Sequence, residues 1–434
     1  MDTIKEIKQT AVCGEYDVVV VGGGVAGVAA ALAAGRNGSK VLLIEKTTML
    51  GGLATAGLVV IYLPICDGMG HKIHSGIAEE LLYASIKYGY NSLPEKWRGG
   101  PWETDAKERY QTIFNAPAFI MALDELIREA KVDVLLDTIF CDVVMEDGCC
   151  KAVVVENKSG RQAYRCKAAV DASGDADVLY QAGAPCVEQD NLLTLWAYCQ
   201  SDNNDFIFPP AGYPPKFFKI MALGSFNKAG IPADTPMYRG TDAWQVTDFL
   251  LKGREAALRR VKADPSLTFM AFPSQAQYRT TRRLKGDHTL RTEDAGRHFE
   301  DSIGCTGIWN IPGPVYEIPF GTLKNEMIKN IFSAGRIISA ANGQGWETTR
   351  VIPVCALTGE AAGYAAAIFA RSGSDVPVKE LQGMLGANGV MLKMSEQLAE
   401  QSGKWLEGWR KSDNPVTKDQ PDGPVYTKPE SSGR

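Results

Sequence analysis

The chain has 434 residues, of which 46 are Lys or Arg and 51 are Asp or Glu, so its formal net charge is -5. A composition of 45% hydrophobic and 22% charged residues is typical of a globular protein and excludes a disordered or fibrous chain. The slight acidic excess offers no attraction to phosphate backbones, so we expect no nucleic-acid partner. The 44 glycines are the unusual feature of the composition.

Residues 1–15 are polar and lack the apolar core of a signal peptide, and no run approaches the roughly 18 apolar residues needed to cross a bilayer. The 10 cysteines are scattered without a C-x-x-C pair, so the spacing typical of zinc and iron–sulfur sites is missing. These features predict a cytoplasmic protein with reduced thiols, no membrane partner and no metal.

The first predicted elements form a βαβ unit. A buried strand at 17–21 contains four consecutive valines, and a glycine-rich turn then leads into a helix of small residues from Val25 to about Arg36. A second buried strand follows at 41–44 and ends at Glu45. Strand, turn, helix and strand in this order are typical of a parallel sheet that binds a nucleotide.

The middle of the chain predicts two helices and then a group of strands. Helices are expected at 77–88 and 116–131, with a loop or lid at 91–108 between them. A strand is expected at 132–136, followed by a β-meander with strands at 139–145, 151–156 and 161–166, and then by a buried strand at 168–171.

From about residue 185 to 323, proline and aromatic residues become more frequent and the periodicity weakens, which indicates a separate substrate lobe. A strand at 330–334 and a helix of small residues at 352–371 then return to the character of the first sheet. The segment 411–434 contains four prolines among polar residues, so it is expected to be a flexible tail or a strap lying on the surface.

The turn Gly22-x-Gly24-x-x-Gly27 has the spacing of a dinucleotide-binding fingerprint. Gly22 permits a tight turn, Gly24 lets a pyrophosphate approach the backbone, and Gly27 lets helix and strand pack closely. The helix N-terminus presents free N–H groups to the phosphates. Glu45, at the end of the second strand, is placed to accept hydrogen bonds from ribose hydroxyls.

The fingerprint alone leaves NAD and FAD open, and three further features favour FAD. Gly51-Gly52 follows Glu45 closely and gives a second close approach of the backbone. The run from Asp171 to Asp175 ends one returning strand, and Gly335-Arg336 ends another. A chain whose distant parts return to the first sheet suits a cofactor longer than NAD.

These residues carry a family resemblance. The stretch Asp17–Gly27, with Glu45-Lys46 and Gly51-Gly52, resembles the glutathione-reductase-like superfamily of FAD/NAD(P)-binding proteins, and more specifically the bacterial FAD-dependent oxidoreductase family. Further matching stretches are Gly76–Leu81, Asp171–Asp175, Arg282–Gly286, Tyr316–Pro319, Ala334–Arg336 and Thr358–Gly363. The resemblance covers roughly residues 14–392 and is informative about fold and cofactor, but not about substrate.

The resemblance implies an α/β fold with a Rossmann-like FAD-binding domain, a parallel sheet carrying a β-meander, and an inserted α+β substrate lobe. The expected FAD-binding domain comprises residues 14–184 and 326–372, the substrate lobe 185–325, a C-terminal helical segment 373–410, and the tail 411–434. FAD is expected to be noncovalent, because the stretch before Gly51 contains no histidine.

The resemblance also implies roles for individual residues. The helix after Ile352 is expected to aim its N-terminal end at the flavin pyrimidine, where reduced flavin carries negative charge. The residues assigned to FAD are Gly22, Gly24, Val25, Ala26, Gly27, Glu45, Lys46, Gly51, Gly52, Leu53, Ala54, Cys141, Ser173, Gly174, Asp175, Gly335, Arg336, Thr358, Gly359 and Ala362.

Candidates for substrate chemistry come from the four histidines and from an arginine cluster. His71 and His288 are candidate proton carriers and Arg282 is a candidate catalytic residue, while His74 and Arg283 are candidate substrate ligands. Arginines can clamp a carboxylate, but ion pairing with the acidic stretch after Gly286 is an equal alternative. The loop 342–350 lies between two flavin-binding segments, so Trp346, Glu347 and Arg350 are also candidate substrate contacts.

The sequence therefore predicts an FAD-dependent oxidoreductase that moves a hydride between flavin N5 and a small organic substrate at a CH–CH or CH–OH position. An unidentified electron donor or acceptor would complete the reaction. Three alternatives remain open, namely a flavin monooxygenase, an NAD-dependent dehydrogenase and a catalytically silent flavin-binding protein.

Overall fold

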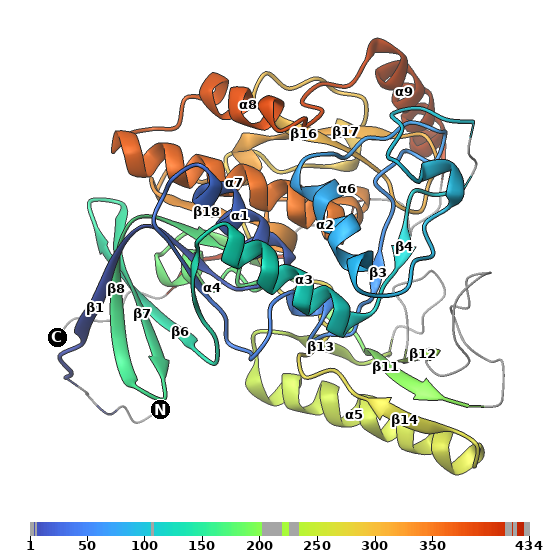
Figure 1. Cartoon of the computed structure of the whole chain (residues 1–434), viewed down its shortest axis with the longest axis horizontal. Helices are drawn as coiled ribbons and strands as arrows, with labels where there is room; N and C mark the ends of the chain where they lie inside the picture. Colours follow the sequence, from blue (N-terminus) through green and yellow to red (C-terminus); the bar gives the residue numbers. More distant parts are fainter. Residues whose placement is uncertain are drawn as a thin grey trace.

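The computed structural model describes residues 4, 7–105, 108–201, 219–224, 234–412, 419 and 423–428. Its main sheet has seven strands, and five of them are parallel. In order across the sheet these are β5 (Asp133–Leu135), β2 (Val41–Ile44), β1 (Ala11–Val21) and β8 (Gly160–Asp171), with β18 (Ile331–Ser333) also paired to β8. Two antiparallel strands, β7 (Cys149–Asn157) and β6 (Ile139–Glu146), extend the sheet beyond β8 (Figure 1).

Two strands are longer than the sequence predicts. β1 begins at Ala11 rather than at Asp17, because it pairs with β8 along its whole length, from Ala11↔Gln162 to Val21↔Asp171. β8 is one strand instead of the two expected at 161–166 and 168–171. It pairs with the meander strand β7 along its first half and with β18 at its end, so the meander and the parallel sheet share a strand.

The helices α1 (Val25–Arg36) and α7 (Ile352–Ser372) pack against each other on one face of the main sheet (Figure 1). The contact is close because α7 presents glycines: a Cβ added at Gly359 would lie 2.1 Å from the Ala26 carbonyl oxygen, and one at Gly363 would lie 2.3 Å from that of Ala30. By length and hydropathy α7 resembles a membrane-spanning helix, but 83% of its apolar window is buried inside the protein, as expected for a core helix.

The segment predicted as a loop or lid, 91–108, is anchored to the body where the structure describes it. Trp97, in the 3-10 turn Glu95–Trp97, is fully buried and stacks on Tyr110 with ring centroids 4.7 Å apart. It follows α2 (Ile77–Lys87), and α3 (Ala116–Glu129) comes after it, with the short strands β3 (Ile61–Tyr62) and β4 (Thr112–Ile113) pairing beside them.

The second part of the chain folds into small antiparallel sheets and one long helix. The helix α5 (Ala243–Ala263) packs on the sheet of β11 (Thr194–Gln200), β12 (Lys219–Gly224) and β14 (Thr268–Ala271). The other elements here are α4 (Asp177–Gln181), β9 (Cys186–Glu188), β10 (Asp190–Leu192), β13 (Met237–Arg239), β15 (Arg282–Leu284), β16 (Ser302–Gly307) and β17 (Val315–Pro319).

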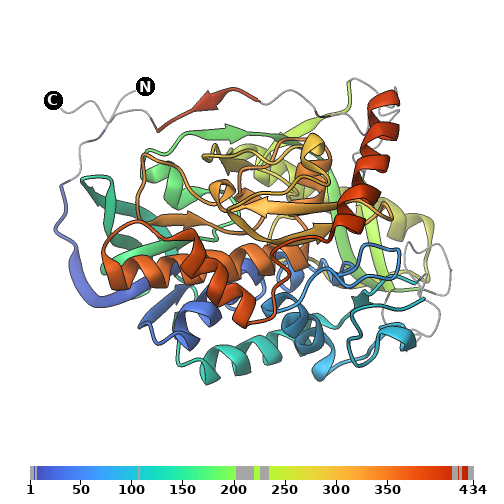
Figure 2. The same ribbon diagram turned by 90° about the horizontal axis from the view of Figure 1, so that it is seen from above.

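The chain ends with α8 (Val378–Ala387), α9 (Glu396–Lys411) and β19 (Val425–Tyr426). β19 pairs antiparallel with β9, and Figure 2 shows it along the outer surface of the protein. Asp419, from the same segment, accepts a hydrogen bond from the backbone N–H of Thr292 at 3.3 Å. Residues 413–418, 420–422 and 429–434 of the predicted tail lie outside the described part of the chain.

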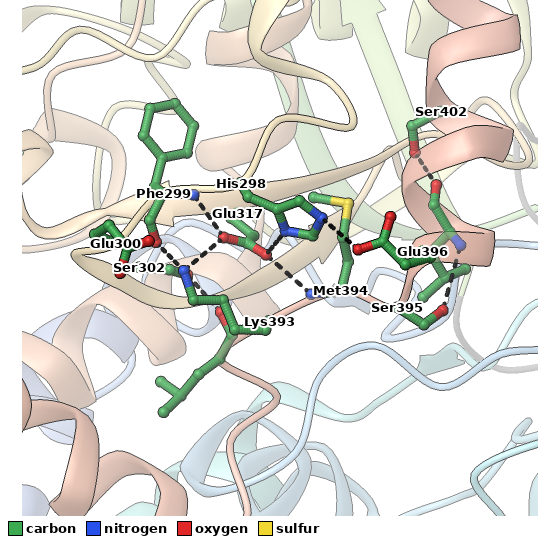
Figure 3. A network of polar contacts seen from close by, with 12 residues as sticks. His298, Phe299, Glu300, Ser302, Glu317, Lys393, Met394, Ser395, Glu396 and Ser402 are labelled. Atoms are coloured by element: carbon green, nitrogen blue, oxygen red, sulfur yellow. Dashed lines mark hydrogen bonds and ion pairs between the residues drawn. The ribbon is translucent and has the colours of Figure 1, made fainter.

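A buried carboxylate joins the connection between α8 and α9 to β17 and to the stretch before β16 (Figure 3). Glu317, on β17, is completely buried and accepts backbone N–H bonds from Phe299 at 2.8 Å and Met394 at 3.0 Å. His298 Nδ1 lies 2.7 Å and Lys393 Nζ lies 3.4 Å from its carboxylate oxygens. One side chain therefore ties together three separate segments, the stretch before β16, β17 itself and the connection from α8 to α9.

We predict that E317Q lowers the free energy of unfolding by about 2–4 kcal/mol, because an amide cannot accept from both backbone N–H groups and leaves a cation without its partner. Chemical denaturation measures this loss. The matched control is E396Q: Glu396 lies 3.8 Å from the other nitrogen of His298 but is 97% exposed, so its loss should change stability by less than about 0.5 kcal/mol. Equal effects of the two substitutions would contradict the prediction.

A second buried carboxylate, Glu360 on α7, joins α7 to α2 and α8. It accepts the backbone N–H of Ile77 at 2.9 Å and an amide N–H of Asn388 at 2.6 Å. Burial raises the pKa of Glu360 from 4.5 to about 7, against the two hydrogen bonds, which lower it. The folded protein therefore holds this proton to higher pH than the unfolded chain does.

We predict that Glu360 makes the free energy of unfolding fall as pH rises from about 4.5 to 7, by up to about 3 kcal/mol. The sign follows because between these pH values the unfolded chain has released this proton while the folded protein still holds it, and the fall ends once the folded group ionises as well. E360Q should flatten this part of the stability curve when denaturation is measured at pH 5 and pH 8. Parallel curves for the two proteins would show that the prediction is wrong.

Candidate functional site

The glycine-rich turn after β1 is built as a cradle. Gly22 has φ +101°, and Gly27 lies so close to it that an added Cβ would be 1.7 Å from the Gly22 carbonyl oxygen. At Gly24, by contrast, an added Cβ would meet only the Gly52 Cα, at 3.9 Å. The backbone at Gly24 is therefore open to a ligand, whereas Gly22 and Gly27 are needed for the fold itself.

The start of α1 faces the same open space. No side chain of the described residues caps this helix, and its first turn contains no acidic residue among them. Its unpaired N–H groups and positive pole are consequently available to an anion. Gly24 forms a β-bridge with Gly51, which brings the second glycine pair alongside the first turn.

Glu45 lies beside the glycine-rich turn and holds its conformation through hydrogen bonds. The side chain is 4% exposed, and its two carboxylate oxygens accept backbone N–H bonds from Gly23 at 2.6 Å and Thr47 at 2.7 Å. Each carboxylate oxygen has a second lone pair, so Glu45 can still accept a hydrogen bond from a ligand hydroxyl.

A cavity that opens to solvent runs along these elements, and the empty space within and in front of it is about 1000 Å³. Fifteen of the sequence-predicted residues line it, namely Gly22, Gly24, Val25, Ala26, Glu45, Lys46, Gly51, Gly52, Leu53, Ala54, Ser173, Gly174, Gly335, Arg336 and Arg350. They come from the first βαβ unit, the end of β8, the turn after β18 and the segment before α7. The structure thus brings four distant parts of the chain to one cavity.

Five other residues predicted to bind the cofactor do not line the cavity and lie behind or beside its wall. Gly27, Gly359 and Ala362 are packed between helices and strands, and Thr358 Oγ1 accepts the Gly335 N–H at 3.0 Å. From β6 the lining residues are Ile139 and Phe140, while the Cys141 thiol lies 3.6 Å from the Ile139 carbonyl oxygen.

Asp175, also predicted to bind the cofactor, positions the guanidinium of Arg336 in the wall of the cavity. One of its oxygens accepts from Arg336 Nη2 at 3.0 Å and from Thr281 Oγ1 at 2.8 Å. Burial would raise the pKa of Asp175, but Arg336 and Lys46 hold it below its ordinary value. Asp177 lines the cavity beside this pair, and burial together with Asp175 raises the pKa of Asp177 to about 6.

Arg282 supports this wall from behind, and Arg283 lies next to it in β15. Arg282 Nη2 donates to Asp177 at 2.6 Å, its Nε donates to the Asp175 carbonyl at 2.9 Å, and its guanidinium lies 4.0 Å from the ring centre of Tyr180. Arg283 is 1% exposed and donates to the Leu284 carbonyl at 3.3 Å. The partner carboxylate of Arg282 is thus Asp177, not the acidic stretch after Gly286.

The histidines lie away from the described lining of the cavity. His71 Nδ1 is 2.7 Å from the buried Asp67, and His288 Nε2 is 3.2 Å from Asp294. His74 Nε2 is 3.0 Å from Thr306 Oγ1, and burial lowers the pKa of His74 to about 3. Among the described residues, no group of three or more His, Cys, Asp or Glu is placed to hold a metal ion.

The segment 346–350 does reach the cavity, through Arg350. Glu347 forms an ion pair with Arg350, whose guanidinium carbon lies 4.8 Å from the ring centre of Trp346. Trp346 is 4% exposed, on the short helix α6 (Gln344–Thr349). Its Nε1, like the Arg350 Nε, has no hydrogen-bond partner among the described residues.

Eleven lining residues were not among the predicted site residues, and three of them are informative. Ile352 and Cys355 come from the first turn of α7, where the resemblance already pointed, so the direction of that helix was a usable signal. Gln275 comes from the irregular part of the lobe, where no pattern marked it. Its side-chain oxygen would lie 4.0 Å from a Cβ at Gly52, which places the lobe directly over the second glycine pair.

The cavity suits a dinucleotide rather than a mononucleotide. Gly24 leaves room for phosphate against the backbone, and Arg336 and Arg350 each keep a buried Nε without a partner among the described residues. Buried donors normally have partners, so these two point to an acceptor supplied by a ligand.

Comparison with known proteins agrees with this fit. Residues 17–194 and 189–385 match the family described as FAD dependent oxidoreductase. The tRNA uridine 5-carboxymethylaminomethyl modification enzyme MnmG of Lactobacillus delbrueckii subsp. bulgaricus (strain ATCC BAA-365 / Lb-18) is 32% identical over 179 residues, which are 39% of this chain and 25% of that protein. Thioredoxin reductase of Ureaplasma parvum serovar 3 is 32% identical over 98 residues, or 23% of this chain and 29% of that protein. The chain thus matches under a third of either relative.

Among solved structures, p-nitrophenol 4-monooxygenase PnpA from Pseudomonas putida DLL-E4 superposes with a TM-score of 0.51 at 14% identity, covering 93% of this chain and 96% of that one. At this identity the likeness shows the fold alone. The family match extends over most of the sequence, from the first strand of the sheet to α8. It confirms the resemblance and favours FAD over NAD as the cofactor. The chain therefore belongs to the FAD dependent oxidoreductase family.

Proposed function

We propose that this oxidoreductase moves a hydride between N5 of noncovalently bound FAD and a small organic substrate at a CH–CH or CH–OH position. The observation that carries the proposal is that one cavity is lined by residues from the fingerprint turn, by Arg350 and, in the substrate lobe, by Gln275. FAD supplies the ring that exchanges the hydride, and the protein supplies position and charge.

In this proposal the ADP half lies along the fingerprint. Glu45 accepts a ribose hydroxyl, and the open backbone at Gly24, with the N-terminus of α1, receives the pyrophosphate. Lys46 and Arg336, whose charges are partly balanced by Asp175, add positive potential to the same wall. Gly51, Gly52 and their neighbours then lead to the other end of the cavity.

In this proposal the ring end lies beside Leu53, Ala54, Gln275 and Arg350, all of which line the cavity. Arg350 and Gln275 bind and orient the polar group of the substrate there, which is the role we assign to the segment 346–350. Arg282 acts as a positioning residue, because it holds Asp177 at the cavity wall by a 2.6 Å bond. His71, His74 and His288 have structural partners and receive no role in hydride transfer.

The expected setting is a reducing compartment such as the cytoplasm. All ten cysteines are free thiols, although the Sγ atoms of Cys150 and Cys166 are only 3.8 Å apart. Free thiols in such a cysteine-rich chain are typical of proteins that stay in reducing surroundings. A small-molecule substrate and a separate electron partner complete the proposal.

The placement of FAD is tested by G24A. A methyl group at Gly24 has room in the protein, because φ at Gly24 is −65° and the nearest atom is 3.9 Å away. It would stand where the pyrophosphate approaches, so we predict a loss of FAD affinity of at least tenfold, or about 1.4 kcal/mol, with no change in the thermal stability of the apoprotein. Titration of apoprotein with FAD measures this loss.

The control is G383A, since Gly383 on α8 has ordinary φ and no atom of the structure within 4 Å of an added Cβ. It should bind FAD like the natural protein. Unchanged affinity in G24A would refute the proposed path of the cofactor, whereas loss of folding in G24A would refute the claim that its methyl group has room.

The reaction is tested by an anaerobic screen of metabolites against the flavin-loaded protein. We predict that a small organic substrate bleaches the flavin absorption, or restores it after chemical reduction, within seconds. Oxygen uptake that depends on both NAD(P)H and a substrate would instead identify a monooxygenase. A flavin whose redox state no substrate or reductant changes would identify a silent flavin-binding protein.

A further inference from the structure

Arg350 occupies a special position between two helices. It follows α6 directly and precedes Val351, the N-cap residue of α7. Its side chain lines the cavity beside Ile352, the first residue of α7, and only 15% of it is exposed. The Arg350 guanidinium therefore lies at the N-terminus of the apolar helix α7, inside the cavity that we assign to FAD.

The guanidinium is held in place from two sides. Glu347 binds it as an ion pair from the preceding turn, and the Trp346 ring lies 4.8 Å from its centre. A cation stacked on an aromatic ring and paired with one carboxylate loses little further freedom when a ligand binds. The Nε donor stays buried without a partner among the described residues, so the group is positioned but not saturated.

Positive potential converges on this point from other sources. α7 has 21 residues, and no acidic residue of the described chain lies in its first turn, so the positive pole of the helix is not neutralised there. Arg279 lies close enough that burial first, and then the charge of Arg350, lower the pKa of Arg279 to about 10. The carboxylate of Glu347 is the opposing charge that pairs with Arg350 directly.

We infer that Arg350 is the cation that stabilises the negative charge acquired by the flavin on reduction, and that Glu347 limits its effect. The inference rests on the proposed function, because it requires the ring end of FAD at Arg350. Hydride transfer breaks a substrate C–H bond and carries its two electrons and the hydrogen to N5. The substrate releases its second hydrogen, from the neighbouring carbon or the hydroxyl, as a proton to solvent. It is thereby oxidised by two electrons, and the ring gains one negative charge.

The ion pair between Arg350 and Glu347 then predicts two effects of opposite sign on the reduction equilibrium of the flavin. Removing Arg350 takes away a positive charge and makes the bound flavin harder to reduce. Removing the charge of Glu347 leaves Arg350 uncompensated and makes the flavin easier to reduce. A merely structural role for the ion pair would move the reduction equilibrium in the same direction in both variants, or in neither.

The experiment measures the reduction equilibrium of the flavin-loaded protein without substrate, anaerobically, against a reference dye of known potential. We expect R350M to lower the ratio of reduced to oxidised flavin at least tenfold, which for a two-electron couple is about 30 mV. We expect E347Q to raise the same ratio by several-fold. R350K keeps the charge and should fall between R350M and the natural protein.

The control pair is Arg36 and Glu80, which form a 2.7 Å ion pair between α1 and α2. R36M and E80Q should leave the flavin ratio unchanged. Unchanged ratios in R350M and E347Q, or shifts of the same sign, would overturn the inference while FAD binding stays intact. Weaker FAD binding in R350M without a shift in E347Q would also overturn it, since Arg350 would then only hold the cofactor.

Failure of the inference can be told apart from failure of the proposed function. If G24A leaves FAD affinity unchanged, the cofactor does not follow the cavity and the proposed site is wrong. If G24A weakens FAD binding but the Arg350 and Glu347 variants keep the natural reduction equilibrium, the site stands and only the role given to Arg350 falls.

Discussion

The architecture depends on one contact, in which two helices from opposite ends of the chain meet backbone to backbone. Gly359 and Gly363 of α7 lie directly against the carbonyl groups of Ala26 and Ala30 on α1, with no room for a side chain between them. Because α1 starts at the fingerprint turn, this contact fixes where α7 must start too. The N-termini of both helices consequently open into one cavity, and a methyl group at either glycine would force them apart.

That arrangement also sets the electrostatics of the cavity. Two helix N-termini, Lys46, Arg336 and Arg350 contribute positive potential, while Asp175, Asp177 and Glu347 oppose it locally. The acids do not cancel the field uniformly, because each is paired with a particular guanidinium. The wall therefore offers positioned cations to a ligand that carries phosphates at one end and gains charge at the other, as FAD does on reduction.

Much of the fold could be predicted because the relevant signals are local. Four valines, a glycine turn and a helix of alanines specify the inner half of β1 and α1, and the small residues of 352–371 specify α7 almost to the residue. The length of β8 was not predictable, because it is determined by partners on both sides rather than by its own pattern. The small sheets of the lobe have too few residues each to show a period.

Polar residues were harder to assign, for a physical reason. A buried arginine needs an acceptor, and the sequence cannot tell whether that acceptor is a protein carboxylate or a ligand. Arg282 has both Asp177 and the Asp175 carbonyl, so its needs are met within the protein. Arg350 has one carboxylate and retains a buried donor. The two look alike in sequence, and only the unfilled hydrogen bond distinguishes the residue that supports the cavity wall from the residue that faces a ligand.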